Sequence, residues 1–300
     1  TGLVALADCD QYESGEIKKH ELTRPAKEDD RVRHMGALNS QTGLVFLTYR
    51  AVGAIDKFVT ERAVAVPDYD FTAADGVRHT AWTVADDDGI SFLRDAFARV
   101  DALYIADGHH RSAAAARVSK ARHGSGGSDG FITVIFPDHQ MQILAYNRVV
   151  KDLNGLSQDG FLVKLGEVFE FKDEGQPQAK NELELYLDGQ WRRLRFRSDY
   201  TKGDRVEDSL DVALLQRHVL APLLGINDPR TSSRIDFVGG IRGSAELEKR
   251  VDEQGWACAF SLHPTSIADL LAVADGGGLM PPKSTWFEPK LRDGLFCHNL

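Results

Sequence analysis

The sequence predicts an α+β protein with two regions. Its 300 residues are 42% hydrophobic and 27% charged, so the chain can bury a sizeable core as one large or two ordinary globular domains and is not disordered. In the first half, strand-like apolar runs alternate with helix-like segments, and two further segments show the alternation and turn signals of antiparallel hairpins. This mixture of strand and helix periods is typical of the α+β class.

Strand and helix patterns of the first half follow one another in order. Residues 1–12 begin as a strand and leave into a polar turn, 16–35 carry helix-like charge interrupted by Pro25, and 43–49 form a buried strand. The other elements expected here are antiparallel strands in 60–71 and 77–89 with turns at Asp75-Gly76 and Asp88-Gly89, a helix over 91–103, a strand at 104–106, a helix to Arg122, a Gly/Ser loop at 123–130, and strands at 131–136 and 142–150.

Beyond about residue 150 the composition of the segments changes. The expected elements are a helix or strand over 161–171, a hairpin of 182–189 and 191–199, an amphipathic helix over 210–225 that ends at Gly225, a strand at 234–241, a helix at 244–255, a strand at 257–264 and a helix at 266–278. We therefore divide the chain into regions 1–150 and 151–300, although no Pro/Ser linker marks the boundary.

Charge and cysteine content exclude several classes of protein. A net charge of −9 argues against a general nucleic-acid or anionic-membrane binder, because both need a positive field. The three cysteines are odd in number and lack C-x-x-C spacing, so they suggest neither a disulfide framework nor a zinc ribbon and indicate a reducing, cytoplasmic compartment. No run approaches the ~20 apolar residues of a membrane span, and no basic leader precedes an apolar stretch. The chain begins without Met, so we expect it to be a piece of a longer protein.

Several familiar motifs are absent or incomplete. Residues 277–284 mimic a phosphate-binding P-loop, but Pro282 occupies a required glycine and two prolines remove main-chain N–H donors. The Gly/Ser loop follows a helix rather than a strand, so it is not a dinucleotide-binding fingerprint. A G-x-S-x-G elbow and an H-E-x-x-H pair are missing from the sequence.

A D-G-H-H-R motif at residues 107–111 lies between a short apolar run and an alanine-rich helix. If the helix starts between Gly108 and Ser112, the motif lies where main-chain N–H groups lack helical partners and the helix dipole is positive, which favours anions. Gly108 lets the main chain approach a ligand without a Cβ atom. Arg111 adds a planar guanidinium suited to phosphate, and the two histidines add donors. The motif therefore predicts phosphate binding.

A purely structural interpretation of the same motif also stands. Asp107 could cap the helix while His109 and His110 only hydrogen-bond to loop carbonyls. Adjacent histidines are poor partners for one metal ion, because neighbouring side chains on a helix diverge by roughly 100°, and no third ligand lies at helical spacing. We predict no protein-built metal site.

Four separated motifs together resemble one family. They are I-K-K-H-E-L-T-R-P at 17–25, D-G-H-H-R at 107–111, L-G-I-N-D-P-R-T-S-S-R-I-D-F-V-G-G-I-R-G at 224–243 and M-P-P-K-S-T-W-F-E-P-K-L at 280–291. They are similar to a widespread bacterial and archaeal family known as the domain of unknown function 1015. The resemblance covers essentially the whole chain. Members of the family usually have a further N-terminal segment, which agrees with the missing Met.

The D-G-H-H-R motif in turn resembles the phosphate loop of the ParB/sulfiredoxin-like superfamily, and within it that of free-serine kinases. The resemblance implies a ParB/sulfiredoxin-like nucleotide-binding region in 1–150 and an α/β region in 151–300 that closes the site. It implies ATP or ADP as ligand, with Mg²⁺ bridging the phosphates. The residues expected to hold the nucleotide are Gly108, His109, His110, Arg111 and Ser112.

Catalytic and substrate-binding roles follow from the same resemblance. In the serine kinases a glutamate on an N-terminal segment is the general base, and Glu21 is the matching residue here. Phosphoryl transfer needs one such carboxylate to orient the attacking hydroxyl. Asp107 would hold Mg²⁺ or orient His109, and His20 and Arg24 would contact the substrate. From spacing alone, an ordinary solvated helix charge is the favoured interpretation of Glu21, and the resemblance reverses that preference.

Two further groups of residues each have a binding interpretation and a structural one. Arg242 and the run Lys283, Ser284 and Thr285 could present cations and hydroxyls to a bound anion, and we include them as candidate substrate-binding residues. Alternatively, the prolines and aromatic residues around the run fix the C-terminal strand to the core. Residues 146–148 could line the pocket or pair within a sheet.

The resulting hypothesis is a nucleotide-dependent kinase that phosphorylates a small hydroxyl metabolite, with free serine as the first candidate. One alternative is a nucleotide-binding regulatory or switch protein without metabolite turnover, and another is a phosphate-ester hydrolase that uses water as nucleophile. The expected partners are a nucleotide and a small-molecule substrate. The acidic balance and the lack of a helix-turn-helix argue against nucleic acid, no membrane partner is expected, and the sequence does not indicate the oligomeric state.

Overall fold

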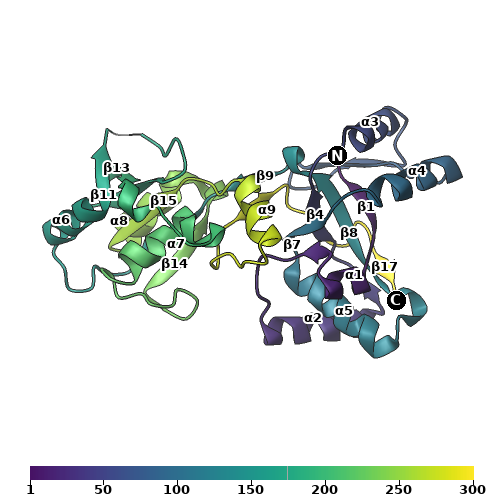
Figure 1. Cartoon of the computed structure of the whole chain (residues 1–300), viewed down its shortest axis with the longest axis horizontal. Coiled ribbons are helices and arrows are strands. Elements are labelled where there is room, and N and C mark those ends of the chain that lie inside the picture. The colour runs from purple at the N-terminus through teal and green to yellow at the C-terminus, as the bar shows by residue number, and fades with distance from the viewer. Residues whose placement is uncertain (174) are drawn as a thin grey trace. The chain divides into compact units, whose positions relative to one another are not determined.

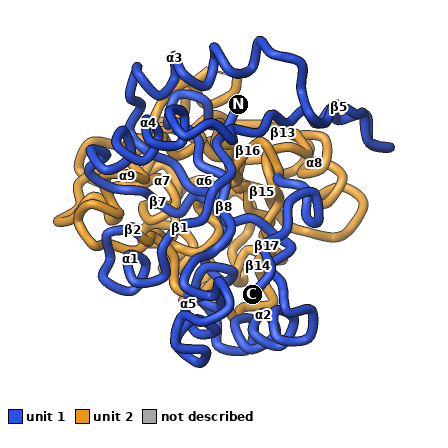
Figure 2. Tube along the Cα trace, turned by 90° about the vertical axis from the view of Figure 1, so that its right-hand side faces the viewer, with its two compact units in different colours: residues 1–18, 23–141, 291–300 blue, residues 19–22, 142–290 orange. Residues whose placement is uncertain are grey.

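The computed structural model describes residues 1–173 and 175–300 and separates into two compact units. Unit 1 comprises residues 1–18, 23–141 and 291–300, and unit 2 comprises 19–22 and 142–290 (Figure 2). The change between units near residue 141 lies close to the expected position at 150, but the last ten residues return to unit 1. Both units combine helices with sheets, which confirms the α+β class.

Unit 1 is built on a mixed five-stranded sheet in the order β1-β8-β4-β7-β2. β1 pairs antiparallel with β8, β4 lies parallel to β8 and antiparallel to β7, and β2 is parallel to β7. The strands are β1 (Leu3–Asp8), β2 (Ile17–Lys18), β4 (Val45–Tyr49), β7 (Leu103–Asp107) and β8 (Gly130–Pro137). The strands β4, β7 and β8 are nearly continuous apolar runs, as expected for strands in the middle of a covered sheet.

Helices cover the sheet of unit 1, and α2 lies alongside α5 (Figure 1). The helices are α1 (Cys9–Ser14), α2 (Pro25–Leu38), α3 (Gly53–Arg62), α4 (Asp87–Phe97) and α5 (His109–Arg122). The run of alanines in α5 is buried, and its small side chains allow the helix to approach the sheet and α2 closely. Arg117 joins the two helices through ion pairs to Glu28 at 3.2 Å and Asp29 at 2.8 Å.

Two small sheets complete unit 1. β5 (Tyr69–Thr72) and β6 (Arg78–Ala81) form the expected hairpin, and Gly76 turns it with a φ of 81°. The C-terminal β17 (His298–Asn299) pairs with β3 (Ser40–Gln41), so the end of the chain is part of this unit.

Unit 2 contains a six-stranded antiparallel sheet in the order β11-β13-β12-β15-β10-β14. Its strands are β10 (Tyr146–Val150), β11 (Phe169–Lys172), β12 (Glu182–Leu187), β13 (Gln190–Phe196), β14 (Ile235–Gly239) and β15 (Cys258–Leu262). The helices are α6 (Gln158–Val168), α7 (Asp211–Leu215), α8 (Gly243–Gln254) and α9 (Ile267–Asp275). β9 (Gln142–Leu144) pairs separately with β16 (Trp286–Glu288).

Side chains alternate between the two faces of this sheet. Val149 and Val238 pack with Leu247 of α8 in one hydrophobic cluster. Because neighbouring residues of a strand point to opposite faces, Arg148 and Phe237 lie on the other face, and they are register partners on β10 and β14.

The structure corrects five local expectations. Pro25 does not interrupt a helix but begins α2, because a first helical residue needs no N–H partner. The polar turn after β1 is the short helix α1, capped by the Asp8 carboxylate. Asp88-Gly89 is no hairpin turn; it lies in the first turn of α4, where Asp86 caps the Gly89 amide at 2.8 Å. Residues 142–150 form two strands in different sheets rather than one.

The fifth correction concerns the helix expected over 210–225. α7 continues as a π-helical turn, η5 (Gln216–Leu220), in which the Ala221 amide donates to the Gln216 carbonyl at 3.0 Å. The side-chain amide of Gln216 donates to Ile226 O of the following loop at 2.7 Å. None of the helices in residues 1–173 and 175–300 is both long and apolar enough to cross a membrane.

Candidate functional site

The junction of β7 and α5 positions the D-G-H-H-R motif. β7 pairs with β4 on one side and β2 on the other, so its last residue, Asp107, stands at the end of a strand inside the sheet. Gly108 is the N-cap of α5 with a φ of 103°, which a residue with a side chain rarely adopts. Its carbonyl accepts the amides of Arg111 at 2.8 Å and Ser112 at 3.0 Å, so the helix is regular from its first turn. The strand, glycine and helix N-terminus occur as expected.

Arg111 is the side chain of the motif with the most unused hydrogen-bonding capacity. Its Nε atom is buried and has no acceptor among the described residues. Its nearest carboxylate is Asp107, with 4.0 Å between Arg111 Nη2 and Asp107 Oδ1, a separation too long for a hydrogen bond. A Cβ atom at Gly108 would lie only 3.0 Å from Arg111 Nη2, so the guanidinium packs directly against the glycine. A buried donor without an acceptor is costly, and a bound anion would satisfy it.

Two residues near Arg111 were not found by sequence analysis. A Cβ atom at Gly43 would lie 2.8 Å from the Asp293 carboxylate and 3.3 Å from Arg111 Cδ, so the absence of a side chain at 43 allows both to approach. Asp293 belongs to the C-terminal segment, which is held there by the hydrogen bond from Gly294 N to Thr42 O at 2.7 Å. Residues 43, 111 and 293 are far apart in sequence, and a lone glycine was the only available signal.

The other members of the motif have defined contacts. His110 Nε2 accepts a hydrogen bond from the Arg24 amide at 3.0 Å, and burial lowers the pKa of His110, so this imidazole is neutral near pH 7. Ser112 is fully buried, and its hydroxyl donates to the His109 carbonyl at 3.1 Å. The His110 side chain therefore binds the main chain at the N-cap of α2, and the Ser112 side chain binds the main chain of α5.

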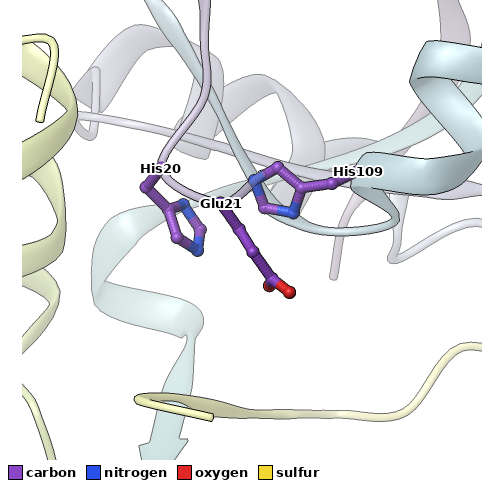
Figure 3. Close-up of side chains that lie close together, drawn as sticks. All are labelled: His20, Glu21 and His109. Carbon is purple, nitrogen blue, oxygen red and sulfur yellow. The ribbon is translucent and has the colours of Figure 1, made fainter. Parts of the chain in front are cut away.

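His109 belongs to a group of three close side chains. Single donor atoms of His20, Glu21 and His109 all lie within 4.8 Å of one another (Figure 3). Residues 19–22 belong to unit 2, where the His20 carbonyl accepts a hydrogen bond from the Met280 amide at 2.8 Å. The main chain joins this short segment to residues of unit 1 at both of its ends. Two imidazoles and one carboxylate are donors of the kind that bind zinc. The sequence analysis predicted no metal site at the adjacent pair His109 and His110, whereas the structure brings His109 close to His20 and Glu21.

Comparison with known proteins identifies the family. The profile of a family described as protein of unknown function (DUF1015) matches residues 1–213. The chain belongs to this family. The expected family is thereby confirmed, and the matched part of this DUF1015 chain includes the D-G-H-H-R motif. No curated protein gives a significant match.

Solved structures with a similar fold share little sequence with this DUF1015 chain. SbnI from Staphylococcus aureus, with a C-terminal truncation, is 13% identical with a TM-score of 0.51 over 96% of this chain and 84% of its own. A free serine kinase variant in complex with AMP is 12% identical with a TM-score of 0.47, over 95% and 87%. A conserved hypothetical protein from Pyrococcus furiosus is 12% identical with a TM-score of 0.44, over 97% and 93%. At such identities the likeness to SbnI concerns the fold alone.

The remaining candidate residues of this DUF1015 chain lie in unit 2. Arg242 is exposed, and its guanidinium lies 3.6 Å from Glu246 on the next turn of α8. Lys283 extends over the ring of Tyr146 at 5.2 Å, while Ser284 is buried and donates to Pro281 O at 2.5 Å. Thr285 is half-buried. Within the described residues, the hydroxyl of Ser284 thus stabilises the turn after the two prolines.

Proposed function

We propose that this protein binds a nucleotide at the β7–α5 junction and transfers a phosphoryl group to a small hydroxyl metabolite, with free serine as the first candidate. The observation that carries the proposal is Arg111, which lies directly beside the αL residue Gly108 and whose buried Nε has no acceptor in the part of the chain that the structure describes. A helix N-terminus and an arginine fork together supply main-chain and side-chain donors to phosphate oxygens.

The residues of unit 1 suit this ligand by charge as well as by position. Arg111 and the first amides of α5 would contact the phosphates, and Gly108 leaves room for them at the main chain. The neutral His110 adds no charge, but its bond to the Arg24 amide links the motif to the start of α2. This geometry supports a ParB/sulfiredoxin-like mode of nucleotide binding in this unit.

The exposed carboxylate of Asp107 is a hard oxygen ligand of the kind that Mg²⁺ uses together with substrate phosphates. The ion would supply charge neutralisation between the phosphate oxygens. Asp107 is suited to hold it because the carboxylate stands at the strand end immediately before Gly108.

Glu21 is proposed as the general base that orients the acceptor hydroxyl and takes its proton. Its side chain is exposed, so a substrate can reach it, and its neighbours His20 and His109 provide nitrogen atoms to position the carboxylate. Among the candidate substrate-binding residues, His20 and Arg24 flank this base in sequence. The roles of Arg242, Lys283, Ser284 and Thr285 in substrate binding remain part of the same proposal.

Calorimetric titration of ATP and ADP with Mg²⁺ tests the nucleotide site. We expect micromolar binding that weakens about 10-fold or more in Arg111→Ala, because each hydrogen bond to a charged group contributes about 1.5–3 kcal/mol. Arg122→Ala is the matched control, since this arginine lies at the other end of α5 and binds Asn39 at 2.8 Å. Equal affinities of the wild type and Arg111→Ala would contradict the site.

Transfer of labelled phosphate to serine, measured beside the release of free phosphate, tests the reaction. Labelled phosphoserine supports the kinase. Release of free phosphate alone would indicate a hydrolase instead of a kinase. Nucleotide binding without turnover would indicate a regulatory protein.

A further inference from the structure

Unit 2 contains a cavity of about 280 Å³ whose lining residues all belong to that unit. Its walls come from β10, β14, the π-helical turn η5, the loop at 227–230 and the two prolines at 281 and 282. Two of the four family-like motifs, at 224–243 and 280–291, therefore meet in this wall. The proposed nucleotide function uses none of these lining residues.

Arg148 is the buried charge of this cavity. It is 3% exposed and lies in the middle of β10, with its guanidinium 5.5 Å from the centre of the Phe237 ring. Two N–H groups bind main-chain carbonyls, those of Tyr146 and of Lys283, the latter at 3.0 Å. A guanidinium has five N–H donors, so most of its donor capacity is not used by these two bonds.

A buried arginine normally has a carboxylate partner, because an isolated buried charge is costly. Arg193 of the same sheet illustrates this rule, since it binds Glu182 at 2.7 Å. Within residues 1–173 and 175–300, Arg148 forms no ion pair, and burial lowers its pKa to about 9. The negative charge that would compensate this guanidinium is therefore expected from a ligand.

Gln216 contributes an unsatisfied acceptor to the same cavity. Its Nε2 donates to Ile226 O at 2.7 Å, while its Oε1 is buried without a donor among the described residues. The residue opens the π-helical turn, and such turns are frequent at functional sites. A ligand that fills the cavity would satisfy this oxygen with an N–H or O–H group.

The remaining charges of the cavity cancel. Asp228 and Arg230 form a bidentate pair with both N–O distances at 2.9 Å, so this loop adds no net charge. One uncompensated guanidinium matches one negative charge, which favours a carboxylate over a doubly charged phosphate. The two prolines at 281 and 282 offer no main-chain N–H donors to a phosphate.

We propose that this cavity binds a small organic acid that carries a hydroxyl or amino group next to its carboxylate, with the carboxylate on Arg148 and the neighbouring donor on Gln216. A volume of about 280 Å³ lies at the lower end of ligand pockets, which suits a metabolite rather than a polymer. The inference concerns unit 2 alone and does not depend on nucleotide binding in unit 1.

The test uses the full chain with Arg111→Ala and without nucleotide, so that an anion does not bind at the D-G-H-H-R motif of unit 1, and thermal shift and calorimetry are the readouts. The probes are L-serine, L-lactate, propionate, ethanolamine and inorganic phosphate. We expect L-serine or L-lactate to bind and raise the melting temperature, propionate to bind about 5–10-fold more weakly for lack of one hydrogen bond, and ethanolamine and phosphate not to bind. Failure of every carboxylate at 10 mM, or binding of phosphate alone, would overturn the proposal.

Variants assign the binding to the two named residues. Arg148→Met is expected to weaken carboxylate binding about 10-fold or more, while Arg195→Met, an exposed arginine on β13, leaves it unchanged. If Arg148→Met does not fold, Arg148→Lys keeps the charge and removes the planar fork, and the same loss is expected. Gln216→Met should abolish the preference of L-lactate over propionate. Wild-type affinity in the Arg148 variants, or an unchanged preference in Gln216→Met, would contradict the assignment.

Discussion

The two units each contain an arginine whose donors the protein does not satisfy, but the two differ in burial and surroundings. Arg111 in unit 1 has a side chain 26% exposed, a carboxylate 4.0 Å away and a helix N-terminus beside it. Arg148 in unit 2 is 3% exposed and bonded only to main-chain carbonyls. The first setting can meet a multiply charged, partly hydrated ligand, whereas the second lies in a cavity of about 280 Å³ that suits a small ligand.

Under the two proposals, the same kind of side chain would bind two kinds of anion. At the β7–α5 junction, main-chain amides lie beside the guanidinium, so several phosphate oxygens would find donors. In the cavity of unit 2, the further buried polar side-chain atom without a partner among the described residues is the acceptor Gln216 Oε1, so the proposed ligand brings a donor of its own. Each prediction below separates the two settings or the roles within one of them.

The largest effect is expected from Glu21→Gln, which keeps the size of the side chain and removes its basicity. Phosphoryl transfer to serine should fall about 10²–10⁴-fold, the usual contribution of a general base, while ATP affinity changes less than about twofold. Transfer of labelled phosphate to serine measures the reaction, and calorimetry measures ATP affinity. Glu16→Gln, at an exposed position on the same segment, is the control. Retained transfer in Glu21→Gln would remove the proposed base and leave the nucleotide site intact.

A smaller effect is expected from Gly108→Ala in unit 1. A φ of 103° is unfavourable for alanine, and the new Cβ would stand 3.0 Å from Arg111 Nη2, so the guanidinium must move. We expect a loss of stability of about 1–2 kcal/mol and a weakening of ATP binding by about 10-fold, measured by urea unfolding and calorimetry.

Gly15→Ala provides the matched control for that variant. Gly15 has a φ of 85°, and a new Cβ there would have no neighbouring atom within 4 Å. Alanine at this position should therefore destabilise the main-chain conformation without affecting a ligand site. Equal ATP affinities of the Gly108 and Gly15 variants would show that the Gly108–Arg111 contact does not shape the nucleotide site.

The local part of the nucleotide site could be predicted from sequence, whereas its distant partners could not. The strand, Gly108 and the start of α5 are contiguous, and each follows from turn and helix chemistry within a few residues. Gly43 and Asp293 reach Arg111 only through tertiary packing of the C-terminal segment, which leaves no periodic signal. The family itself was recognised from short motifs and is confirmed by the profile match.

Unit 2 shows a different limit of sequence analysis. The strands of its sheet were expected, and Arg148 was noted as a residue that could line a pocket or pair within the sheet. The π-helical turn was not expected, because residues 210–225 have an ordinary amphipathic pattern that gives no sign of the changed main-chain hydrogen bonding at Gln216. The cavity exists only once that turn and the prolines at 281 and 282 line the same wall.

Two buried groups, Asp211 in unit 2 and His110 in unit 1, should give opposite dependences of stability on pH, and Glu184 of unit 2 has a pKa raised by burial to about 7 as well. Burial raises the pKa of Asp211 to about 7, so the folded state binds more protons than the unfolded state between pH 4 and 7. The contribution of Asp211 to the free energy of unfolding is present at low pH and is lost as the pH rises through 7. Asp211→Asn, which can still accept the Asn181 amide, should raise stability at pH 8 by about 1–2 kcal/mol and not at pH 4, as measured by urea unfolding.

Asp199→Asn, on an exposed turn of the same unit, controls for the loss of a surface charge. If Asp211→Asn is no more stable than the wild type at pH 8, the carboxylate is not held in its protonated form by burial.

The smallest effect is expected from His110 in unit 1, with the opposite sign. Burial lowers the pKa of His110, so the unfolded state binds more protons, and stability present above pH 6.5 is lost as the pH falls through the lowered value. Protonation would also remove the lone pair that accepts the Arg24 amide at 3.0 Å. His110→Gln can keep an acceptor there without titrating, so its urea midpoint should fall less between pH 7.5 and 5 than that of the wild type. Because His218 of unit 2 has a pKa lowered by burial as well, only the difference between variant and wild type reports on His110. Parallel pH profiles of the two proteins would mean that His110 is not kept neutral by its burial against α2.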